Sequence, residues 1–216
     1  MRILITAGPT REAIDPVRYL TNRSSGKMGY AIARAAVERG HDVVLVSGPV
    51  TLEAPVGRCE LVSVESAREM FDAVRTRIGN CDAAVFCAAV ADYRPIQAAT
   101  QKIKKTGATL TLELERTEDI LGSAREGFGF GGILVGFAAE TDHIEEYAWR
   151  KLEEKGCDLI VANDVSRPGV GFDSERNEVR LFFANGRRID LGESPKAKIG
   201  EKLVEIIEGL AEDAAN

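Results

Sequence analysis

The chain has 216 residues, 44% of them hydrophobic and 29% charged, and this composition indicates an ordinary globular protein, for which we expect a single domain over residues 1–216. The formal net charge of −6 argues against nucleic-acid binding, because that function depends on basic patches. The longest apolar run, residues 83–91, is about half as long as a membrane-spanning helix requires, so we expect a cytoplasmic protein without a membrane span.

Short runs rich in Val, Ile and Leu alternate with helical patterns along the chain, which predicts an α/β fold built on a mostly parallel sheet flanked by helices. We expect strands at Ile3–Thr6, Asp42–Ser47, Ala83–Ala88, Ile133–Phe137 and Leu159–Ala162. After the first strand, apolar residues recur with helical spacing at Met28, Ile32, Ala35 and Ala36, and Gly40 ends that helix. Further helices are expected at Ser66–Ile78, His143–Lys155 and Pro195–Leu210.

The C-terminal part of the chain carries a strong hairpin signal. Asn185-Gly186, two residues that tolerate positive φ, separate the strand-like stretches Glu178–Phe183 and Arg187–Leu191. We therefore expect a β-hairpin and then a helix appended to the sheet. The long loops are Thr10–Ser25, Tyr93–Gly107 and Ser166–Arg176, and loops of this length in a compact domain are usually functional.

The four cysteines, Cys59, Cys81, Cys87 and Cys157, show no C-x-x-C spacing. Two of them lie in apolar, strand-like surroundings, so buried thiols are favoured over disulfides or zinc ligands. The chain has only two histidines, which also argues against zinc chemistry.

The first predicted strand runs into the segment Thr6–Glu12. Open α/β sheets bind ligands where strands end at the carboxyl edge, and Gly8 would let a phosphate approach the backbone there. The same residues also fit an ordinary strand-ending turn, with Arg11 as a surface charge.

The segment Asn22–Gly29 opens the first helix, where free backbone N–H groups and the positive end of the helix dipole favour an anion. Ser24 and Ser25 also suit helix capping, so a plain capping segment is the alternative. It is not a Walker A loop, because Thr21 stands where that pattern requires its first glycine. Gly127–Gly132 fits G-x-G-x-x-G formally but precedes a strand, and we interpret it as unrelated to dinucleotide binding.

Three further groups of charged residues are candidates for ligand binding. Asp92 follows a buried strand and would accept hydrogen bonds at the same sheet edge, or simply cap its loop. Lys102 and Lys104 alternate onto one side of a strand-like run, which also fits a solvated strand. Lys151 and Lys155 share a helix face and would hold a polyphosphate together, or lie exposed near Glu154.

The sequence shows no Ser/His/Asp or Cys/His set that would serve nucleophilic catalysis. A reaction whose nucleophile is a carboxylate of the substrate does not need one. Positioning and charge neutralisation then carry the catalysis, and positioning alone is worth roughly 7–11 kcal/mol.

The chain closely resembles the phosphopantothenate-cysteine ligase family. The resemblance lies in five motifs that occur in the same order and cover nearly the whole length: Asn22–Gly29, Ala88–Tyr93, Lys102–Lys105, Gly136–Thr141 and Ala162–Ser166. It implies a Rossmann-like fold, a homodimer with active sites near the subunit interface, and a reaction that uses Mg²⁺ and CTP. 4'-Phosphopantothenate would be activated as an acyl-cytidylate, and the amine of L-cysteine would then displace CMP.

The resemblance also assigns site residues. It implies that Asn22 contacts phosphopantothenate and promotes reaction of the acyl intermediate, that Ser24, Ser25 and Gly26 belong to the same loop, and that Lys102 is the catalytic lysine that neutralises phosphate charge. The nucleotide pocket would comprise Cys87, Ala88, Ala89, Asp92, Phe137, Lys151 and Lys155. Thr117, Glu118, Asp119 and Ile120 stand where the family commonly has Asn-Pro-Asp-Ile, and the extra charge of Glu118 puts the side-chain contacts there in doubt.

Some alternatives stay open at the level of sequence. In many bacteria the ligase is fused to a flavin-dependent decarboxylase, so the chain is either a stand-alone ligase or one domain of a bifunctional protein. The preference for CTP over ATP rests on the resemblance alone, and no metal ligands are assigned. The rival functions are an NAD(P)-dependent oxidoreductase, which requires a glycine fingerprint that Gly8-Pro9-Thr10 does not supply, and a non-catalytic nucleotide-binding module.

Overall fold

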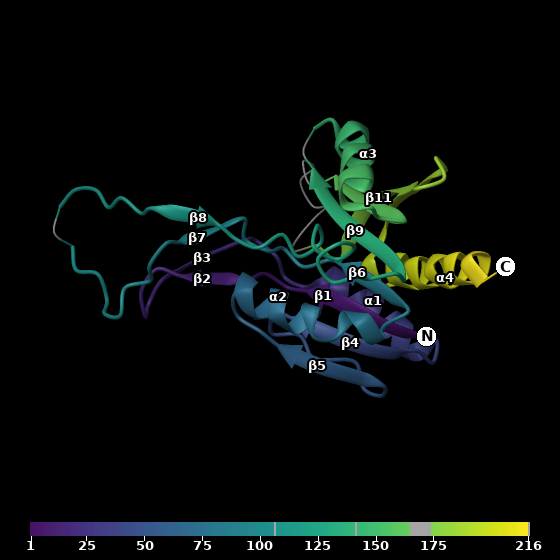
Figure 1. Cartoon of the computed structure of the whole chain (residues 1–216), viewed down its shortest axis with the longest axis horizontal. Coiled ribbons are helices and arrows are strands. Elements are labelled where there is room, and N and C mark those ends of the chain that lie inside the picture. Colours follow the sequence, from purple (N-terminus) through teal and green to yellow (C-terminus); the bar gives the residue numbers. More distant parts are fainter. Residues whose placement is uncertain (106, 141, 165–173, 216) are drawn as a thin grey trace.

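The computed structural model describes residues 1–105, 107–140, 142–164 and 174–215. Within them, eight strands form one sheet in the order β12-β11-β10-β9-β6-β1-β4-β5 (Figure 1). The strands are β1 (Arg2–Ala7), β4 (Asp42–Ser47), β5 (Cys59–Ser63), β6 (Ala83–Phe86), β9 (Ile133–Glu140), β10 (Leu159–Asp164), β11 (Arg176–Phe183) and β12 (Arg188–Pro195). The strands from β5 to β10 pair in parallel, and β11 and β12 are antiparallel. The predicted Rossmann-like sheet with an appended hairpin and helix is therefore confirmed.

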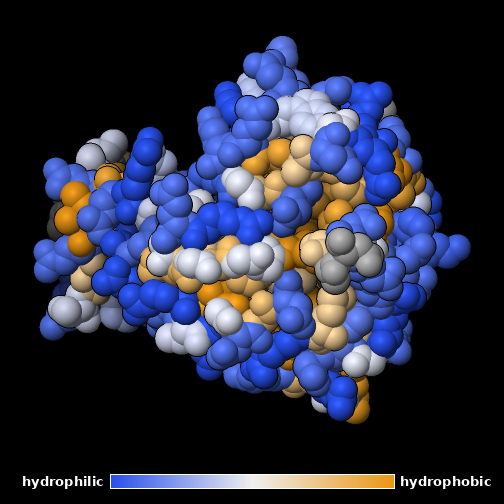
Figure 2. Space-filling model, turned by 45° about the vertical axis from the view of Figure 1, so that its right-hand side comes forward, coloured by the Kyte–Doolittle hydropathy of each residue, from blue (hydrophilic) through white to orange (hydrophobic). Residues whose placement is uncertain are grey.

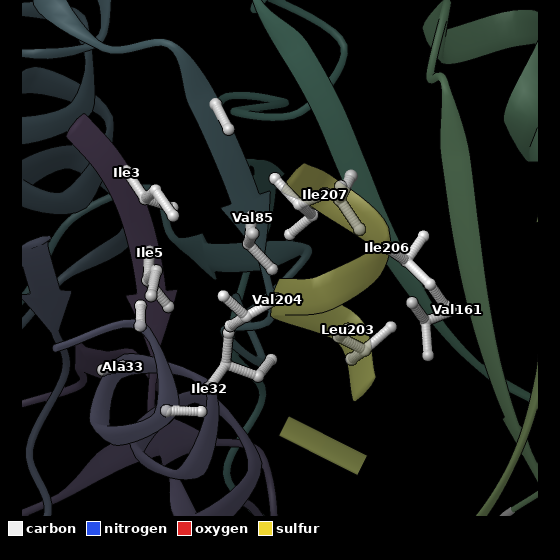
Figure 3. Packing of buried hydrophobic residues seen from close by; sticks show 14 of the residues in the cluster. Ile3, Ile5, Ile32, Ala33, Val85, Val161, Leu203, Val204, Ile206 and Ile207 are labelled. Carbon is white, nitrogen blue, oxygen red and sulfur yellow. The ribbon is translucent and has the colours of Figure 1, made fainter. Parts of the chain in front are cut away.

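Helices cover both faces of the sheet. The helices are α1 (Lys27–Glu38), α2 (Ala67–Arg75), α3 (Ile144–Lys155) and α4 (Lys196–Ala215), with a short 3-10 turn, η1, at Ile78–Asn80. Successive side chains of a strand point to opposite faces, so Ile3 and Ile5 pack toward α1 and α4, whereas Leu4 packs toward α2 and α3. Figure 3 shows the first of these layers, in which Ile32 of α1 and Val204 of α4 lie close to the strands.

The start of α1 lies against the end of β1. A Cβ atom at Gly29 would lie 2.6 Å from the Cβ of Ala7, so only glycine allows this approach. Gly26, at the N-cap, has φ of 76°, in the left-handed region that favours glycine. These two glycines bring the start of the helix to the carboxyl edge of the sheet.

The sequence predicted most elements of the body but missed the edge strand β5. None of its five residues is buried and the strand has no clear apolar face, because an edge strand packs on few neighbours. The predicted helix at Ser66–Ile78 is shorter and starts with a capping box formed by Ser66 and Glu69. The predicted hairpin turns at Asn185-Gly186, where Gly186 has φ of 83°.

Two of the predicted loops form a projecting arm, which we define as Arg11–Thr21 together with the described residues of Tyr93–Arg116 (Figure 1). The arm contains the short hairpins β2–β3 (Arg11–Ala13, Tyr19–Thr21) and β7–β8 (Tyr93–Pro95, Leu114–Arg116). The expectation of loops was therefore wrong for β2, β3 and β7, while β8 lies beyond the predicted loop. The two hairpins contact each other, and Ala99 N donates a hydrogen bond to Ile14 O at 2.9 Å. Most of the third loop, Ser166–Arg176, lies outside the described residues.

The buried carboxylate of Asp15 joins the two halves of the arm. It accepts hydrogen bonds from Val17 N and Arg18 N at 2.9 Å, and from Ile103 N at 3.1 Å. It also forms an ion pair with the guanidinium of Arg18, whose other contact is the carbonyl of Ile103 at 3.1 Å. This ion pair, together with the hydrogen bonds from the backbone, holds the pKa of Asp15 well below its usual range, although desolvation acts in the opposite direction.

All four cysteines are free thiols, but the expected burial is confirmed only for Cys157 and was wrong for the other three, which are partly exposed. Among the described helices, none combines the length and the apolar character that crossing a membrane requires.

Candidate active site

The carboxyl ends of β1, β6, β9 and β10 meet the start of α1 and enclose two adjoining cavities. The chain leaves β1 toward β4 on one side, while β6 lies on the other side, and ligands of open α/β sheets bind at such a switch point. We call the first the α1 cavity; it has a volume of about 340 Å³ and is lined by Asn22–Gly29 and the ends of the neighbouring strands. The second, the β8 cavity, measures about 530 Å³ and is lined by Arg116–Leu121, Asp92 and α3. Ala88, Val90, Phe137 and Lys151 line both.

The α1 cavity receives the N-terminus of α1. Gly26 is the N-cap, and in the described structure no side chain caps the helix at this position. Ser24 Oγ accepts a long hydrogen bond from Gly26 N at 3.4 Å, so the capping role expected for the serines is only partly met. Backbone N–H groups at an uncapped helix start are suited to an anion.

The charged residues that line the α1 cavity in the described structure are all cations, although Lys27 forms an ion pair with Glu175 beside it. Its lining contains four cationic residues, Arg23, Lys27, Lys151 and Lys196, and within the described part of the chain no carboxylate lines it. This is a local excess of positive charge in a chain with a net charge of −6. The arrangement suits an anionic ligand.

Three buried polar residues on the far strands and α4 also line the α1 cavity: Asn163, Asn177 and Lys196. Asn163 is 7% exposed, and its Oδ1 has no hydrogen-bond partner among the described residues. A buried acceptor without a partner is costly, so the site suits a ligand that brings an N–H or O–H donor. None of the three was assigned to the site from the sequence, although Asn163 lies near the end of β10, at the edge that also carries Asp92.

Asn22 is fixed to the loop that follows β6. Its Nδ2 donates to Ala89 O at 3.2 Å and to Val90 O at 2.9 Å. Cys87, at the start of the same loop, has its pKa raised to about 12 by burial, with a smaller opposing effect of the Lys196 charge. The Cys87 thiol is therefore protonated at neutral pH and contributes packing rather than a nucleophile.

The β8 cavity combines carboxylates with cations that pair with them. Glu118 receives hydrogen bonds from Arg68 at 2.5 Å and from Arg94 at 3.0 Å. Burial alone would raise the pKa of Glu118, but its backbone hydrogen bond and these two arginines lower it. Its extra charge is therefore compensated within the protein, which removes the physical ground for doubting the contacts of the neighbouring residues.

Thr117 and Asp119 are also held in place. Thr117 Oγ1 donates to Ala91 O at 2.6 Å, and Thr117 N donates to Asp92 O at 3.0 Å. Asp119 pairs with Lys155 at 2.5 Å and accepts from Gly122 N at 2.8 Å. These bonds lower the pKa of Asp119 against the opposing effect of its burial.

The two lysines of α3 lie on the wall of the β8 cavity, as their i, i+4 spacing predicted. Lys151 Nζ donates to the carbonyl of Phe137 at 2.8 Å and so lies where the two cavities join. Asp92 and Ile120 line the same cavity, with the Asp92 side chain exposed.

The structure thus gathers most of the candidate residues, in two sets. The α1 cavity takes Asn22, Ser24, Ser25, Gly26, Cys87 and Ala89; the β8 cavity takes Asp92, Thr117, Glu118, Asp119, Ile120 and Lys155; Ala88, Phe137 and Lys151 line both.

Two candidates stay outside both cavities. Gly8 has φ of 75° and its carbonyl accepts from Ala89 N at 2.9 Å, so it supports the loop after β6 without lining either cavity. Lys102 is exposed on the arm and lines neither cavity.

Residues 1–210 match the family model described as the DNA/pantothenate metabolism flavoprotein C-terminal domain. The chain belongs to this family. Similar curated proteins are named coenzyme A biosynthesis bifunctional protein CoaBC: that of Vibrio vulnificus is 49% identical over 210 residues, and that of Bacillus subtilis is 48% identical over 209. These alignments cover 96% and 97% of this chain but 52% and 51% of the relatives, so the chain spans about half their length.

Solved structures share the fold of this chain. A crystal structure of the C-terminal domain of CoaBC has 45% identity and a TM-score of 0.83, and the match covers 98% of this chain and 96% of that one. A Cab2 mutant in complex with phosphopantothenate-cysteine is 15% identical with a TM-score of 0.79, covering 98% of this chain and 86% of that one, and it shows a shared fold. The family resemblance expected from the sequence motifs is therefore confirmed.

Proposed function

We propose that this chain is a phosphopantothenate-cysteine ligase of coenzyme A biosynthesis that uses CTP. The observation that carries the proposal is the pair of joined cavities: the charged residues that line the first are all cations, and in the second Glu118 and Asp119 form ion pairs with cations of the protein. The names of the CoaBC relatives and the product held by the Cab2 structure fit the same reaction.

In this proposal phosphopantothenate occupies the α1 cavity. Its phosphate would lie at the start of α1 among the cationic side chains, where dipole and charge both favour a dianion. The hydroxyl and amide groups of the pantothenate part carry the donors that Asn163 Oδ1 requires. Its carboxylate would then point to the shared wall at Val90 and Phe137.

CTP would occupy the β8 cavity with its α-phosphate at the same wall. A carboxylate oxygen attacks the α-phosphorus and pyrophosphate leaves, which forms the acyl-cytidylate. The amine of cysteine then attacks the acyl carbon, the C–O bond to CMP breaks, and the nitrogen loses a proton. Both nucleophiles belong to the substrates, which agrees with a site whose cysteine is protonated.

The exposed position of Lys102 fits a homodimer in which each arm reaches the site of its partner. Exposed apolar side chains gather on the arm: Val17, Tyr19, Tyr93, Ile96, Leu110 and Leu114. In Figure 2 the lobe at the left carries a small group of hydrophobic residues among mostly hydrophilic ones. Exposed apolar patches of this kind commonly mark protein–protein contacts, and a second copy of the arm is the proposed partner.

Mg²⁺ would enter with the nucleotide and reduce the negative charge on its phosphates. Among the described residues, no three His, Cys, Asp or Glu side chains cluster as a metal site. This fits the usual mode of Mg²⁺, which binds one or two carboxylates together with substrate phosphates. Asp92 and Asp119 are the carboxylates of the β8 cavity best placed to assist.

The segment after β1 argues against an oxidoreductase function. Gly8-Pro9-Thr10 gives no dinucleotide fingerprint there. The formal fingerprint Gly127–Gly132 precedes β9, and a Cβ at Gly132 would lie 2.4 Å from the carbonyl of Asp82, so this glycine serves backbone packing.

The proposal is tested by incubating the purified protein with CTP, Mg²⁺, phosphopantothenate and cysteine. We expect CMP, pyrophosphate and phosphopantothenoylcysteine in equal amounts, and a side-by-side assay with ATP measures the base preference. Absence of CMP and pyrophosphate would contradict the ligase. Calorimetric binding of CTP without binding of phosphopantothenate would instead favour a nucleotide-binding module. The relatives' extra length also motivates a flavin-dependent decarboxylase partner domain, which a longer expressed chain would reveal by its flavin absorbance.

A further inference from the structure

Most charged side chains of the β8 cavity already have a partner within the protein. The charged residues in its described lining are Asp92, Arg116, Glu118, Asp119, Lys151 and Lys155. Glu118 is paired with Arg68 and Arg94, and neither arginine lines the cavity. Asp119 is paired with Lys155. The two acids of this segment are therefore neutralised without the help of the remaining cations of the lining.

Arg116 differs from these residues, because its guanidinium forms no hydrogen bond or ion pair with another residue in the described ranges. It is the last residue of β8, it lies opposite Tyr93 of β7, and its side chain is exposed. The backbone that follows it is held in place, since Thr117 donates hydrogen bonds to Ala91 O and Asp92 O. Arg116 thus combines an anchored backbone with a cation that is available to a ligand.

The place of Arg116 in the lining indicates which part of the nucleotide it would meet. Val90 and Phe137 belong to the wall that the two cavities share, whereas Arg116 lines the β8 cavity alone. In the proposed function the α-phosphate lies at the shared wall, so Arg116 would meet a part of the nucleotide further from the acyl group. The two outer phosphates carry most of the negative charge of the nucleotide, and a guanidinium binds phosphate oxygens in a bidentate manner.

We propose that Arg116 is a catalytic residue of the first reaction step, in which its guanidinium binds the β- and γ-phosphates of the nucleotide and stabilises the pyrophosphate that leaves. This inference rests on the proposed function and adds a residue to it that the sequence motifs did not assign. When the carboxylate oxygen forms its bond to the α-phosphorus, the bond from that phosphorus to the bridging oxygen breaks, and the electron pair stays on the pyrophosphate. A guanidinium bound to the outer phosphates stabilises the transition state because negative charge increases there.

The test compares Arg116→Gln with wild type in calorimetry with CTP, CMP and inorganic pyrophosphate, each in the presence of Mg²⁺. We expect the variant to bind CTP and pyrophosphate roughly tenfold more weakly and to bind CMP as wild type does, because CMP lacks the two outer phosphates. In single-turnover assays the release of pyrophosphate should slow roughly thirty- to a hundredfold. The reaction of pre-formed acyl-cytidylate with cysteine should keep its rate, because pyrophosphate has already left.

Two further variants separate charge, shape and position. Arg116→Lys keeps the charge but not the planar guanidinium, so it should restore part of the lost affinity and rate. Arg58→Gln is the matched control, because Arg58 is also an exposed arginine and lines neither cavity.

The outcomes distinguish a phosphate contact from a structural role. If Arg116→Gln weakened CMP binding as much as CTP binding, or left the release of pyrophosphate unchanged, the inference would be overturned. A wild-type protein that releases pyrophosphate in a manner dependent on Arg116 but forms no amide would contradict the ligase while supporting the inference. A wild-type protein that binds neither CTP nor pyrophosphate would contradict both.

Discussion

The α1 cavity and the β8 cavity share a wall but balance their charges differently. Around the α1 cavity, cations gather without a carboxylate in the described lining. Around the β8 cavity, the protein itself neutralises its acids, since Glu118 pairs with Arg68 and Arg94, and Asp119 pairs with Lys155. A cavity with a cationic lining suits an anionic ligand, whereas the ion pairs of the β8 cavity hold its groups in a fixed geometry. Substitutions should therefore affect the acid substrate on one side and the nucleotide on the other.

The largest effect is expected for Asn22→Asp. The change places a negative charge in the cationic cavity and removes the amide donor to Ala89 O and Val90 O, so the acyl intermediate should lose its positioning. We expect amide formation to slow roughly 100- to 1000-fold with the fold retained. The slowing is measured in single-turnover assays that follow the release of pyrophosphate and the formation of the amide separately. The control is Asn80→Asp at an exposed site; unchanged amide formation in Asn22→Asp would remove Asn22 from the mechanism.

Lys102→Gln should lower turnover roughly 100-fold without changing ligand binding to the α1 cavity. If each site uses Lys102 from the partner arm, coexpression of Asn22→Asp with Lys102→Gln should form heterodimers with one intact site. Turnover of the mixture should then recover to roughly a quarter of wild type. The control is Lys104→Gln, on the same exposed run. A mixture as inactive as its parents, or a monomer in sedimentation, would contradict the shared site.

Lys155→Ala should weaken nucleotide binding in the β8 cavity without affecting the acid substrate. It leaves Asp119 without its cation next to the nucleotide phosphates, so the KM for CTP should rise about tenfold while the KM for phosphopantothenate stays the same. Arg150→Ala, which removes an exposed cation from the same helix, serves as control. Parallel increases in both KM values would show that the two cavities do not act as separate binding sites.

The sequence predicted the residues of the β8 cavity better than those of the α1 cavity. Asp92, Lys151 and Lys155 were found because strand ends and helical spacing are visible in the sequence, and both place side chains at a sheet edge. Asn177 and Lys196 were missed because they reach the cavity through the antiparallel strand β11 and the following helix, and no local pattern shows which way that hairpin folds back. Asn163 could have been predicted by the same rule as Asp92, since it too lies at the carboxyl end of a strand of the sheet.

The arm was not predicted from the sequence for a different reason. Its strands have three residues each and carry exposed apolar side chains, so neither length nor alternation marks them. Lys102 looked like part of the nucleotide site because its motif resembles the family, yet within one chain it lies on the arm and outside both cavities. A sequence motif identifies the residue but does not show where the arm that carries it lies relative to the cavities.

The smallest effect on chemistry is expected from Asp15→Asn, which tests the arm. The Asp15 carboxylate, paired with Arg18, has a lowered pKa, so its stabilising contribution is present above the ordinary aspartate pKa of about 4 and is lost as the pH falls further. The variant should therefore have a lower Tm than wild type at pH 7, and the gap in Tm should narrow below about pH 4, where Asp15 of the unfolded chain takes up a proton that the folded carboxylate binds only at lower pH. Asp42→Asn, at an exposed residue, is the control. Because Ile103 N is held by Asp15, turnover should fall together with Tm while the KM for phosphopantothenate is unchanged. A gap in Tm that stays constant from pH 7 to pH 3 would show that the carboxylate charge does not hold the arm together.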